Sequence, residues 1–417
     1  MVTDKRISIF DFALAISEAV DLVAPALNNH HKKVANISCN IALAMELPNS
    51  EVQDIVLAAV LHDIGAFSVE ERIELMAPDS FDVEKNRHAL LGYKLLKGFG
   101  PLAKAAGLIR RHHADYSRPG EDAPVGSHII HLADRVAVSF DDSRDITGQI
   151  PLALEKIDEK SHVFHPGALS AFKRIAGHEY FLLEAFSPSL CMVSMKRIWF
   201  SQVIADLDTL RGFARVIAQI IDFRSRFTAT HSNGVAAVAN ELTSISGFSE
   251  RECKLMEIAG FLHDVGKLAV PNSILEKNGS LDDEEFNTVK KHAYYTYAIL
   301  ASIDGLENIA TWAASHHERQ DGNGYPFHVK NEDFSKFSRV MAVADILTAL
   351  MEDRPYRAGM DREEAEEALL RMAENGGIDK NIVDLVKEHF FRINDARVKA
   401  QQAASKEYEA FRVGLAG

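Results

Sequence analysis

Apolar residues recur along most of the chain at intervals of three and four positions, which is the period of an amphipathic α-helix. Clear examples are VQDIVLAAVLHDIG at 52–65 and RECKLMEIAGFLHDVG at 251–266. Alternating β-branched runs joined by Asn-Gly turns, which would indicate hairpins, are nearly missing. The pattern therefore predicts an all-α fold.

The two halves of the chain repeat each other. LAAVLHDIGAF at 57–67 resembles IAGFLHDVGKL at 258–268, and RHALLGYKLL at 87–96 resembles KHAYYTYAIL at 291–300. Two self-similar segments in the same order indicate an internal duplication.

The spacing of the histidines supports the same conclusion. A spacing of 32 residues is shared by His30–His62 and His231–His263. A spacing of 24 residues is shared by His88–His112 and His292–His316. The next gap differs, because seven extra residues of the second half fall in the stretch that holds a Gly-Tyr-Pro loop.

The duplication predicts a domain organisation. We expect a first domain at 1–190, a linker at 191–205, a second domain at 206–395 and a helical tail at 396–417. The segment 197–223 is expected to be a helix that connects the units or opens the second one. On composition the tail is more typical of a solvated helix than of a helix that binds a partner.

Composition narrows the classes of function. The 417 residues carry a formal net charge of −14, which argues against polymeric nucleic acid as the main partner. The three cysteines form no CxxC pair, which is typical of a reducing cytoplasm. The sequence has no apolar run long enough for a membrane span and no signal-peptide pattern at its start. A cytoplasmic protein is expected.

Each half offers five histidines and two aspartates in the same order. In the second half these candidate metal ligands are His231, His263, Asp264, His292, His316, His317 and Asp345. In the first half they are His30, His62, Asp63, His88, His112, His113 and Asp134. Imidazole and carboxylate groups suit Fe, Mn, Zn, Co or Ni.

A carboxylate has two oxygens, so Asp264 is the natural bridge between two metal ions. His231, His263 and Asp345 would bind one ion, and His292, His316 and His317 would bind the other. Two such ions clamp a phosphoryl oxygen and lower the pKa of a bridging water, which is the chemistry of phosphodiester hydrolysis.

Ordinary core packing is the alternative explanation for buried histidines, but it does not account for two sets with matched spacing. The remaining histidines are interpreted as ordinary residues: His31, His128, His131, His162, His165, His178, His328 and His389.

Three further features of the second half are candidate substrate contacts. Lys267 follows Asp264 by three residues, so its ammonium could bind a phosphate oxygen or protonate the departing O3′. The loop DGNGYP at 321–326, here called the GYP loop, should carry Tyr325 over the site. Arg354 and Arg357 could grip phosphates, although a plain surface pair is almost as consistent with the spacing.

These strings resemble the HD-GYP branch of the HD superfamily of metal-dependent phosphohydrolases. The resemblance covers about 190 residues and rests on HDVGKLAVPNSIL at 263–275, HHERQDGNGYP at 316–326 and RVMAVADILTALMEDRPYR at 339–357. It implies tandem HD-type domains and hydrolysis of a bacterial cyclic dinucleotide, either cyclic di-GMP or 3′,3′-cyclic GMP-AMP. It implies iron or manganese, with magnesium, nickel, cobalt or zinc as alternatives, and often a homodimer.

The chain departs from the family pattern at three positions. Phe227 replaces a glutamate that trinuclear members place four residues before the first histidine, so two metal ions are expected. Thr348 replaces a usual aspartate, which leaves the identity of the dinucleotide open. Thr296 replaces a usual glycine and is interpreted as a packing variation.

The first domain resembles an HD domain that has lost its specialisation. It has Ala66 where the second domain has Lys267, and it lacks the GYP loop and the two arginines. A regulatory or dimerising role is expected, and the retained ligands could form a second metal site. Two alternatives for the whole chain remain: a phosphohydrolase acting on another nucleotide, and a non-catalytic signalling scaffold.

Overall fold

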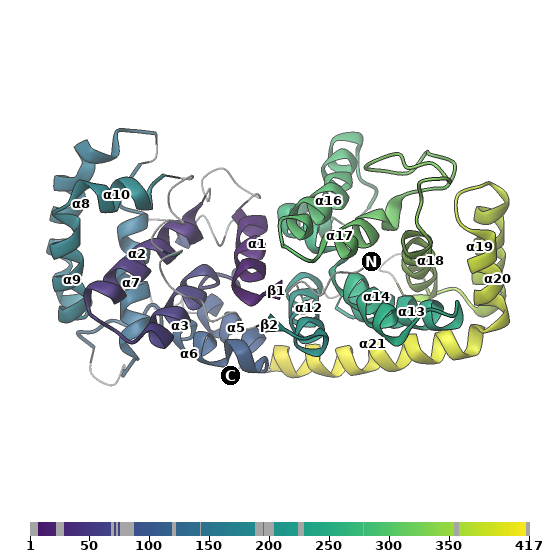
Figure 1. Cartoon of the computed structure of the whole chain (residues 1–417), viewed down its shortest axis with the longest axis horizontal. Coiled ribbons are helices and arrows are strands. Elements are labelled where there is room, and N and C mark those ends of the chain that lie inside the picture. Colours follow the sequence, from purple (N-terminus) through teal and green to yellow (C-terminus); the bar gives the residue numbers. More distant parts are fainter. Residues whose placement is uncertain are drawn as a thin grey trace. The chain divides into compact units, whose positions relative to one another are not determined.

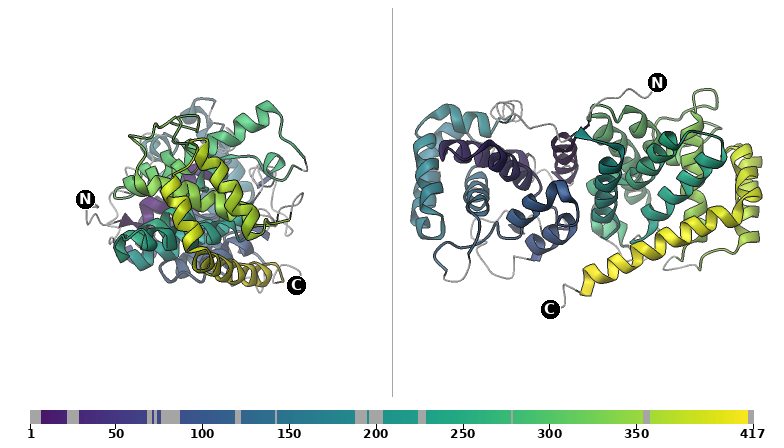
Figure 2. Two further views of the ribbon diagram at one scale, coloured as in Figure 1. Left: turned by 90° about the vertical axis from the view of Figure 1, so that its right-hand side faces the viewer. Right: turned by 60° about the horizontal axis from the view of Figure 1, so that its bottom comes forward.

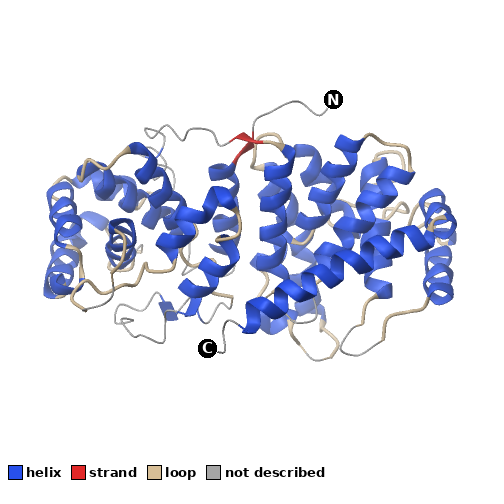
Figure 3. Ribbon diagram, turned by 90° about the horizontal axis from the view of Figure 1, so that it is seen from below, coloured by secondary structure: helices blue, strands red, loops and turns tan. Residues whose placement is uncertain are grey.

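The chain forms two helical units (Figures 1 and 3). The computed structural model describes residues 7–21, 29–67, 71, 74–75, 87–118, 122–141, 143–187, 195, 204–223, 229–277, 279–353 and 358–413. The N-terminal unit is Ser8–Val203, and the C-terminal unit is Ile204–Gly417 together with Met1–Ile7. Apart from two paired two-residue strands, the described elements are helices, which confirms the predicted fold class.

The first part of the chain, up to residue 203, contains one short strand and a series of helices. They are β1 (Ile7–Ser8), α1 (Ile9–Asp21), α2 (His30–Ala44), α3 (Asn49–Val60), α5 (Arg87–Leu96), η3 (Gly100–Leu102), α6 (Ala103–Ile109), α7 (Val125–Ala137), α8 (Ile146–Glu159), η4 (Ser161–Val163), α9 (Pro166–Ala176) and α10 (Glu179–Ala185).

The C-terminal unit follows the same order and adds a long final helix. Its elements are β2 (Ile204–Ala205), α12 (Leu207–Asp222), α13 (His231–Ile245), α14 (Glu250–Leu262), η5 (Val265–Ala269), α15 (Asn272–Leu275), α16 (Asp283–Ala301), α17 (Glu307–Ala314), η6 (Ser315–His317), α18 (Lys336–Met351), α19 (Arg362–Glu374), α20 (Lys380–Glu388) and α21 (Phe390–Val413).

The two units pack their helices in the same way. In the first unit α2 contacts α3, α7 and α9, and α5 contacts α6. In the second unit α13 contacts α14, α18 and α20, and α16 contacts α17. The matched helix pairs confirm the internal duplication inferred from the spacings.

The helices that precede the two His-Asp pairs end earlier than their apolar pattern predicts. α3 ends at Val60 and α14 at Leu262, and the chain then turns sharply instead of continuing to Gly65 and Gly266. A Cβ on Gly266 would lie 2.0 Å from the carbonyl oxygen of His292, so only glycine allows this turn to pack against α16. The early ends place the His-Asp pairs in tight turns beside a neighbouring helix.

The C-terminal tail is not the solvated helix that its composition favours. α21 packs along α13, and its residues Ile393, Arg397 and Ala404 are buried (Figure 2). Tyr408 lies with its ring centroid 5.1 Å from that of Phe223, which directly follows α12. Charged residues on the outer side of α21 dominate its composition. Composition alone therefore does not reveal the side that contacts α13 and α12.

The predicted helix at 197–223 begins at Leu207, where the Asp206 carboxylate accepts a hydrogen bond from the Thr209 amide, and residues 197–203 lie outside the described part. Among the described helices, none combines the length and the apolar character that crossing a bilayer requires.

Candidate metal centre

The structure brings the seven predicted ligands of the C-terminal unit into one buried cluster. Their elements are α13, the turn after α14, α16, η6 and α18. One ligand atom each of His292, His316 and His317 lies within 4.8 Å of the others, and the same holds for His231, His263 and Asp264. Asp345 joins the second group, because its Oδ1 lies 3.2 Å from His231 Nε2. That this cluster binds metal stays a prediction.

Backbone carbonyls fix the orientation of the imidazole rings. The Nδ1 of His263 lies 2.8 Å from the Gly260 carbonyl oxygen, and that of His316 lies 2.7 Å from the Ala313 carbonyl oxygen. A carbonyl can only accept, so each Nδ1 carries the proton and each Nε2 presents its lone pair to the centre of the cluster. His292 is held in the same way, 2.5 Å from the oxygen of Val289.

Acceptor atoms therefore converge without a proton between them. The Nε2 atoms of His292 and His316 are 3.1 Å apart, and the Asp264 Oδ1 lies 3.4 Å from the first and 3.8 Å from the second. The Nε2 of His263 is buried and has no hydrogen-bond partner among the described residues, although the Asp264 Oδ2 is 3.2 Å away. A divalent cation is the group that this arrangement of donors fits.

Burial and neighbouring charges set the protonation states of the metal-free cluster. Burial lowers the pKa of His292 to about 3 and holds the pKa of His316 well below its usual range. Burial also acts on His263, but the Asp264 carboxylate outweighs it and raises the pKa of His263. Metal binding at the His231 and His263 position must therefore displace protons, whereas His292 and His316 are already neutral.

His231 has carboxylates on both sides of its ring. Its Nδ1 lies 2.9 Å from Glu352, and its Nε2 lies 3.2 Å from Asp345. Burial lowers the pKa of His231, but the charge of Glu352 and the hydrogen bond of Asp345 outweigh it and raise that pKa to about 10. Glu352 was not predicted from the sequence. The one feature that could have indicated it is its position two helical turns after Asp345.

Lys267 and Tyr325 both lie beside the cluster, as predicted. The Nζ of Lys267 is 2.5 Å from the Asp264 Oδ2. The ring centroid of Tyr325 is 4.8 Å from that of His317. Burial and the charges of Asp345 and Asp264 raise the pKa of the Tyr325 hydroxyl, which stays protonated and able to donate. Their contacts with substrate stay predictions.

A buried carboxylate holds the chain that follows the GYP loop. Glu318 is 1% exposed and accepts hydrogen bonds from the backbone amides of Phe327, His328 and Val329, at 2.6, 3.2 and 3.1 Å. Within the loop, a Cβ on Gly324 would lie 2.3 Å from the Arg319 nitrogen. Sequence reasoning treated the glycines as the cause of the tight loop and missed the anchoring role of Glu318.

The remaining predicted positions have mixed outcomes. Phe227, Arg354 and Arg357 lie outside the described residues. Thr348 is buried, and its hydroxyl donates to the Ala344 carbonyl oxygen at 2.7 Å. Thr296 was interpreted as a packing variation, but its hydroxyl also makes two hydrogen bonds.

Thr296 ties together the turn that carries the His-Asp pair. Its hydroxyl donates to the His263 carbonyl oxygen at 2.9 Å and accepts from the Gly266 amide at 3.0 Å. The first unit has Gly92 on the matching helix, so this clamp is a feature of the C-terminal unit.

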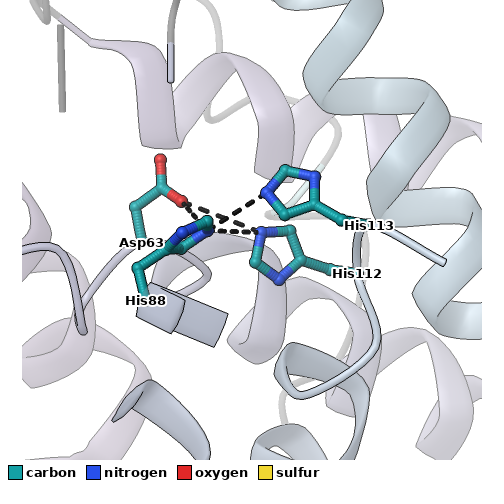
Figure 4. A group of neighbouring side chains, drawn as sticks. All are labelled: Asp63, His88, His112 and His113. Atoms are coloured by element: carbon teal, nitrogen blue, oxygen red, sulfur yellow. Dashed lines mark hydrogen bonds and ion pairs between the residues drawn. The ribbon is translucent and has the colours of Figure 1, made fainter. Parts of the chain in front are cut away.

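The seven predicted ligands of the N-terminal unit also lie together. Asp63, His88, His112 and His113 form one group within 4.8 Å, as Figure 4 shows, and His30, His62 and Asp134 form another. As in the second unit, the Nε2 atoms of two histidines face each other, here His88 on α5 and His112 in the turn after α6, at 3.3 Å.

Two features distinguish this N-terminal cluster from its counterpart. The position of Lys267 is occupied by Ala66, which is buried. The Arg135 guanidinium lies 2.7 Å from the Asp134 Oδ2 and is itself buried, whereas Ile346 follows the corresponding Asp345. The N-terminal cluster retains its ligands, but its neighbouring positive charge is on Arg135, beside Asp134, and not at the position of Lys267.

His31 was interpreted from the sequence as an ordinary residue, but in the structure it lies beside the N-terminal cluster. It forms a third group of potential ligands with His62 and Asp63, and its Nδ1 lies 2.5 Å from the Asp21 carboxylate. The signal in the sequence was its place directly after His30, where the second half has Ser232.

Comparisons with known proteins agree with this architecture. Residues 28–139 and 215–382 each match the family described as HD domain. The chain is 26% identical over 390 residues to 3′3′-cGAMP-specific phosphodiesterase 1 of Vibrio cholerae, covering 89% of each protein. It is 37% identical over 158 residues to a cyclic di-GMP phosphodiesterase of Pseudomonas aeruginosa, covering 37% of each.

A solved structure shares the fold over nearly the whole chain. It is the crystal structure of a cyclic GMP-AMP specific phosphodiesterase of Vibrio cholerae, with a TM-score of 0.62 and 22% sequence identity. The alignment covers 96% of this chain and 98% of that one. The chain therefore belongs to the HD-domain family, with one HD domain in each half and an HD-GYP domain as the second of the two.

Proposed function

We propose that this protein is a metal-dependent phosphodiesterase that hydrolyses a bacterial cyclic dinucleotide at the cluster of its C-terminal unit. The observation that carries the proposal is the convergence of His292 Nε2 and His316 Nε2, 3.1 Å apart, on the Asp264 carboxylate. Two divalent ions, iron or manganese first among the candidates, would be bound by His231, His263, Asp264 and Asp345 on one side and by His292, His316, His317 and Asp264 on the other.

Bound divalent ions supply Lewis acidity toward a phosphoryl oxygen and acidify coordinated water. The residues of the chain supply the remaining parts of the reaction. Asp264 is buried, and His263 and Lys267 outweigh that burial and hold its pKa well below the usual range, so it stays an anion at neutral pH. The Lys267 ammonium is placed to contact a phosphate oxygen or to donate a proton to the departing O3′.

Two side chains, Tyr325 and Glu318, support a position for the substrate beside the cluster. Tyr325 covers the His317 side of the cluster, and Glu318 holds the segment that follows it. A base or ribose can pack against the Tyr325 ring while the phosphodiester faces Asp264 and Lys267. Arg354 and Arg357 are further candidate phosphate contacts, from the sequence alone.

The first substrate to test is 3′,3′-cyclic GMP-AMP. The relative that aligns over 89% of this chain is named for that dinucleotide, whereas the cyclic di-GMP phosphodiesterase of Pseudomonas aeruginosa aligns over 37%. Cyclic di-GMP is the second candidate.

Steady-state hydrolysis of both dinucleotides by protein loaded with Mn²⁺ or Fe²⁺, with metal content quantified, tests the proposal. We expect turnover of at least one of them. The double variant His263→Ala, Asp264→Ala should lose the metal bound at the C-terminal cluster and fall to the rate of the buffer reaction, whereas His178→Ala, at an exposed position, should match the wild type. Activity that survives the double substitution would place the reaction elsewhere, and metal-loaded protein that cleaves neither dinucleotide would reject the function.

A further inference from the structure

The N-terminal unit has a histidine beside its metal cluster that the C-terminal unit lacks. His31 follows His30 at the start of α2, and at the matching position of α13 stands Ser232. The Ser232 hydroxyl donates to the buried Asp222 carboxylate at 2.9 Å. A hydroxyl engaged in this way offers no ligand to a metal ion, whereas an imidazole does.

The ring of His31 is oriented as a metal ligand would be. Its Nδ1 lies 2.5 Å from the Asp21 carboxylate, and both side chains are buried. A carboxylate on Nδ1 fixes the tautomer and leaves Nε2 as the coordinating nitrogen. Asp21 precedes His30 by nine residues, as Asp222 precedes His231, so the same carboxylate supports a serine in one unit and a histidine in the other.

A second, independent observation indicates a ligand at this point. The Nε2 of His62 is fully buried and has no hydrogen-bond partner among the described residues, although the Asp63 Oδ2 lies 3.1 Å away. Its Nδ1 is held 2.8 Å from the Ala59 carbonyl oxygen, so Nε2 faces the carboxylates of Asp63 and Asp134. One ligand atom each of His31, His62 and Asp63 lies within 4.8 Å of the others, and the same holds for His30, His62 and Asp134.

We propose that His31, oriented by Asp21, is an additional protein ligand at the first metal position of the N-terminal unit. Because both groups share the single Nε2 of His62, they surround one ion rather than two. Three imidazoles and two carboxylates then face this ion, against two imidazoles and two carboxylates in the C-terminal unit. One position fewer remains for water or substrate.

A fuller protein coordination sphere is the mark of a metal site that stabilises or senses rather than hydrolyses. The Arg135 guanidinium acts in the same direction, because it occupies the Asp134 Oδ2 and leaves only Oδ1 for an ion. Nitrogen-rich donors favour Zn²⁺, Co²⁺, Ni²⁺ or Fe²⁺ over Mg²⁺ and Mn²⁺. The N-terminal unit is thus a non-hydrolytic site for a borderline transition-metal ion.

Co²⁺ titration of the full-length chain tests this site, with binding followed by visible absorption and metal counted by mass spectrometry. The background carries His263→Ala and Asp264→Ala, so the readout is independent of catalysis and of the proposed function. A further His62→Ala substitution in that background should remove a class of bound Co²⁺ and thereby define the N-terminal site. His162→Ala, at an exposed position, is the matched control and should bind as the background does.

In the same background, His31→Ser should weaken that class of Co²⁺ binding by about a hundredfold or more, and Asp21→Asn by about ten- to a hundredfold. Serine is the residue that the twin helix carries, so the backbone accommodates it, and far-UV circular dichroism in EDTA checks folding. If His31→Ser does not fold, Asp21→Asn decides. Unchanged Co²⁺ affinity in either folded variant, or no loss with His62→Ala, would overturn the proposal.

Discussion

Helix ends prepare the histidines of both units for coordination. His62, His112, His263 and His316 each follow the last residue of a helix within three positions. Each donates from Nδ1 to the carbonyl three residues earlier. Carbonyls in the last turn of a helix have no intrahelical partner, so the histidine satisfies a carbonyl that would otherwise be unpaired. The same contact fixes the tautomer that a metal ion requires.

Lys267 is expected to act on the substrate rather than on the metal ions. Its Nζ is 2.5 Å from the Asp264 Oδ2. Burial and the charge of His263 both affect the pKa of Asp264 more than Lys267 does. Lys267→Ala should therefore keep its bound metal while kcat falls by about 10²–10⁴, the usual contribution of a general acid. Rates and metal content measured on the same preparation check this.

The control is Lys277→Ala, which removes a lysine that pairs with Glu285 at the surface and should leave both quantities unchanged. A Lys267→Ala variant that loses metal in proportion to activity would instead assign Lys267 a role in assembling the site.

The residues found from the sequence belong to a recognisable sequence pattern, whereas those missed do not. The ligand sets were predictable because their order and spacing recur in both halves, and Lys267 and Tyr325 were predictable because they closely follow ligands in the sequence. Glu352 and His31 were not, because a carboxylate or an imidazole has no distinguishing pattern until a helix end brings it to a neighbouring ring. Their roles depend on contacts with His231 and Asp21 that only the packed helices create.

At the scale of elements, the segment between η6 and α18 is anchored in part by one buried side chain. Glu318 is buried and accepts from three consecutive backbone amides, so its two oxygens replace the hydrogen bonds that a helix or strand would supply. The glycines let the loop turn tightly, and Glu318 decides where its end lies. Tyr325 precedes the anchored amides by only two residues and is held with them.

Glu318→Gln should loosen this segment without emptying the metal site. An amide offers one acceptor oxygen where the carboxylate offers two, and the loss of a charged acceptor weakens the anchoring by about 1–3 kcal/mol. We expect kcat/KM to fall by about ten- to a hundredfold with metal content unchanged, measured by steady-state kinetics on metal-loaded protein.

The matched control is Glu332→Gln, which makes the same chemical change at an exposed position of the same segment. Equal kinetics for the Glu318 variant and the wild type would show that the anchored conformation is not needed for substrate binding.

Element boundaries were less predictable than element identity. The apolar period gave the helices that end at Val60 and Leu262 but extended both into the His-Asp turns. Periodicity cannot detect such an end, because the turn remains buried and its apolar residues continue the spacing of the helix. The end is set by the approach of Gly65 and Gly266 to the backbone of a helix distant in the sequence. For the same reason, composition could not reveal that α21 packs on α13.

At the scale of the whole molecule, duplication has produced two units with the same helix order and different sites. The C-terminal unit has Lys267 beside its bridging aspartate, the GYP loop and the Thr296 clamp. The N-terminal unit has His31 and the buried Arg135 instead. Its core does not depend on these differences, because they lie at the cluster and not in the apolar contacts of α2 with α3 and α7.

Two units with separate cores and separate clusters should respond to ligands separately. A ligand that binds only the folded state stabilises it by RT ln(1 + [L]/Kd), which is about 2.7 kcal/mol at a hundredfold excess over Kd. For a unit of about 200 residues this corresponds to a rise in Tm of about 5–10 °C. In calorimetry of the metal-loaded chain, a cyclic dinucleotide should therefore raise one unfolding transition by this amount and leave the other in place. The double variant His263→Ala, Asp264→Ala identifies the responsive transition, because it should abolish that rise. A dinucleotide that shifts both transitions equally would show either that the N-terminal unit also binds it or that the two units unfold as one.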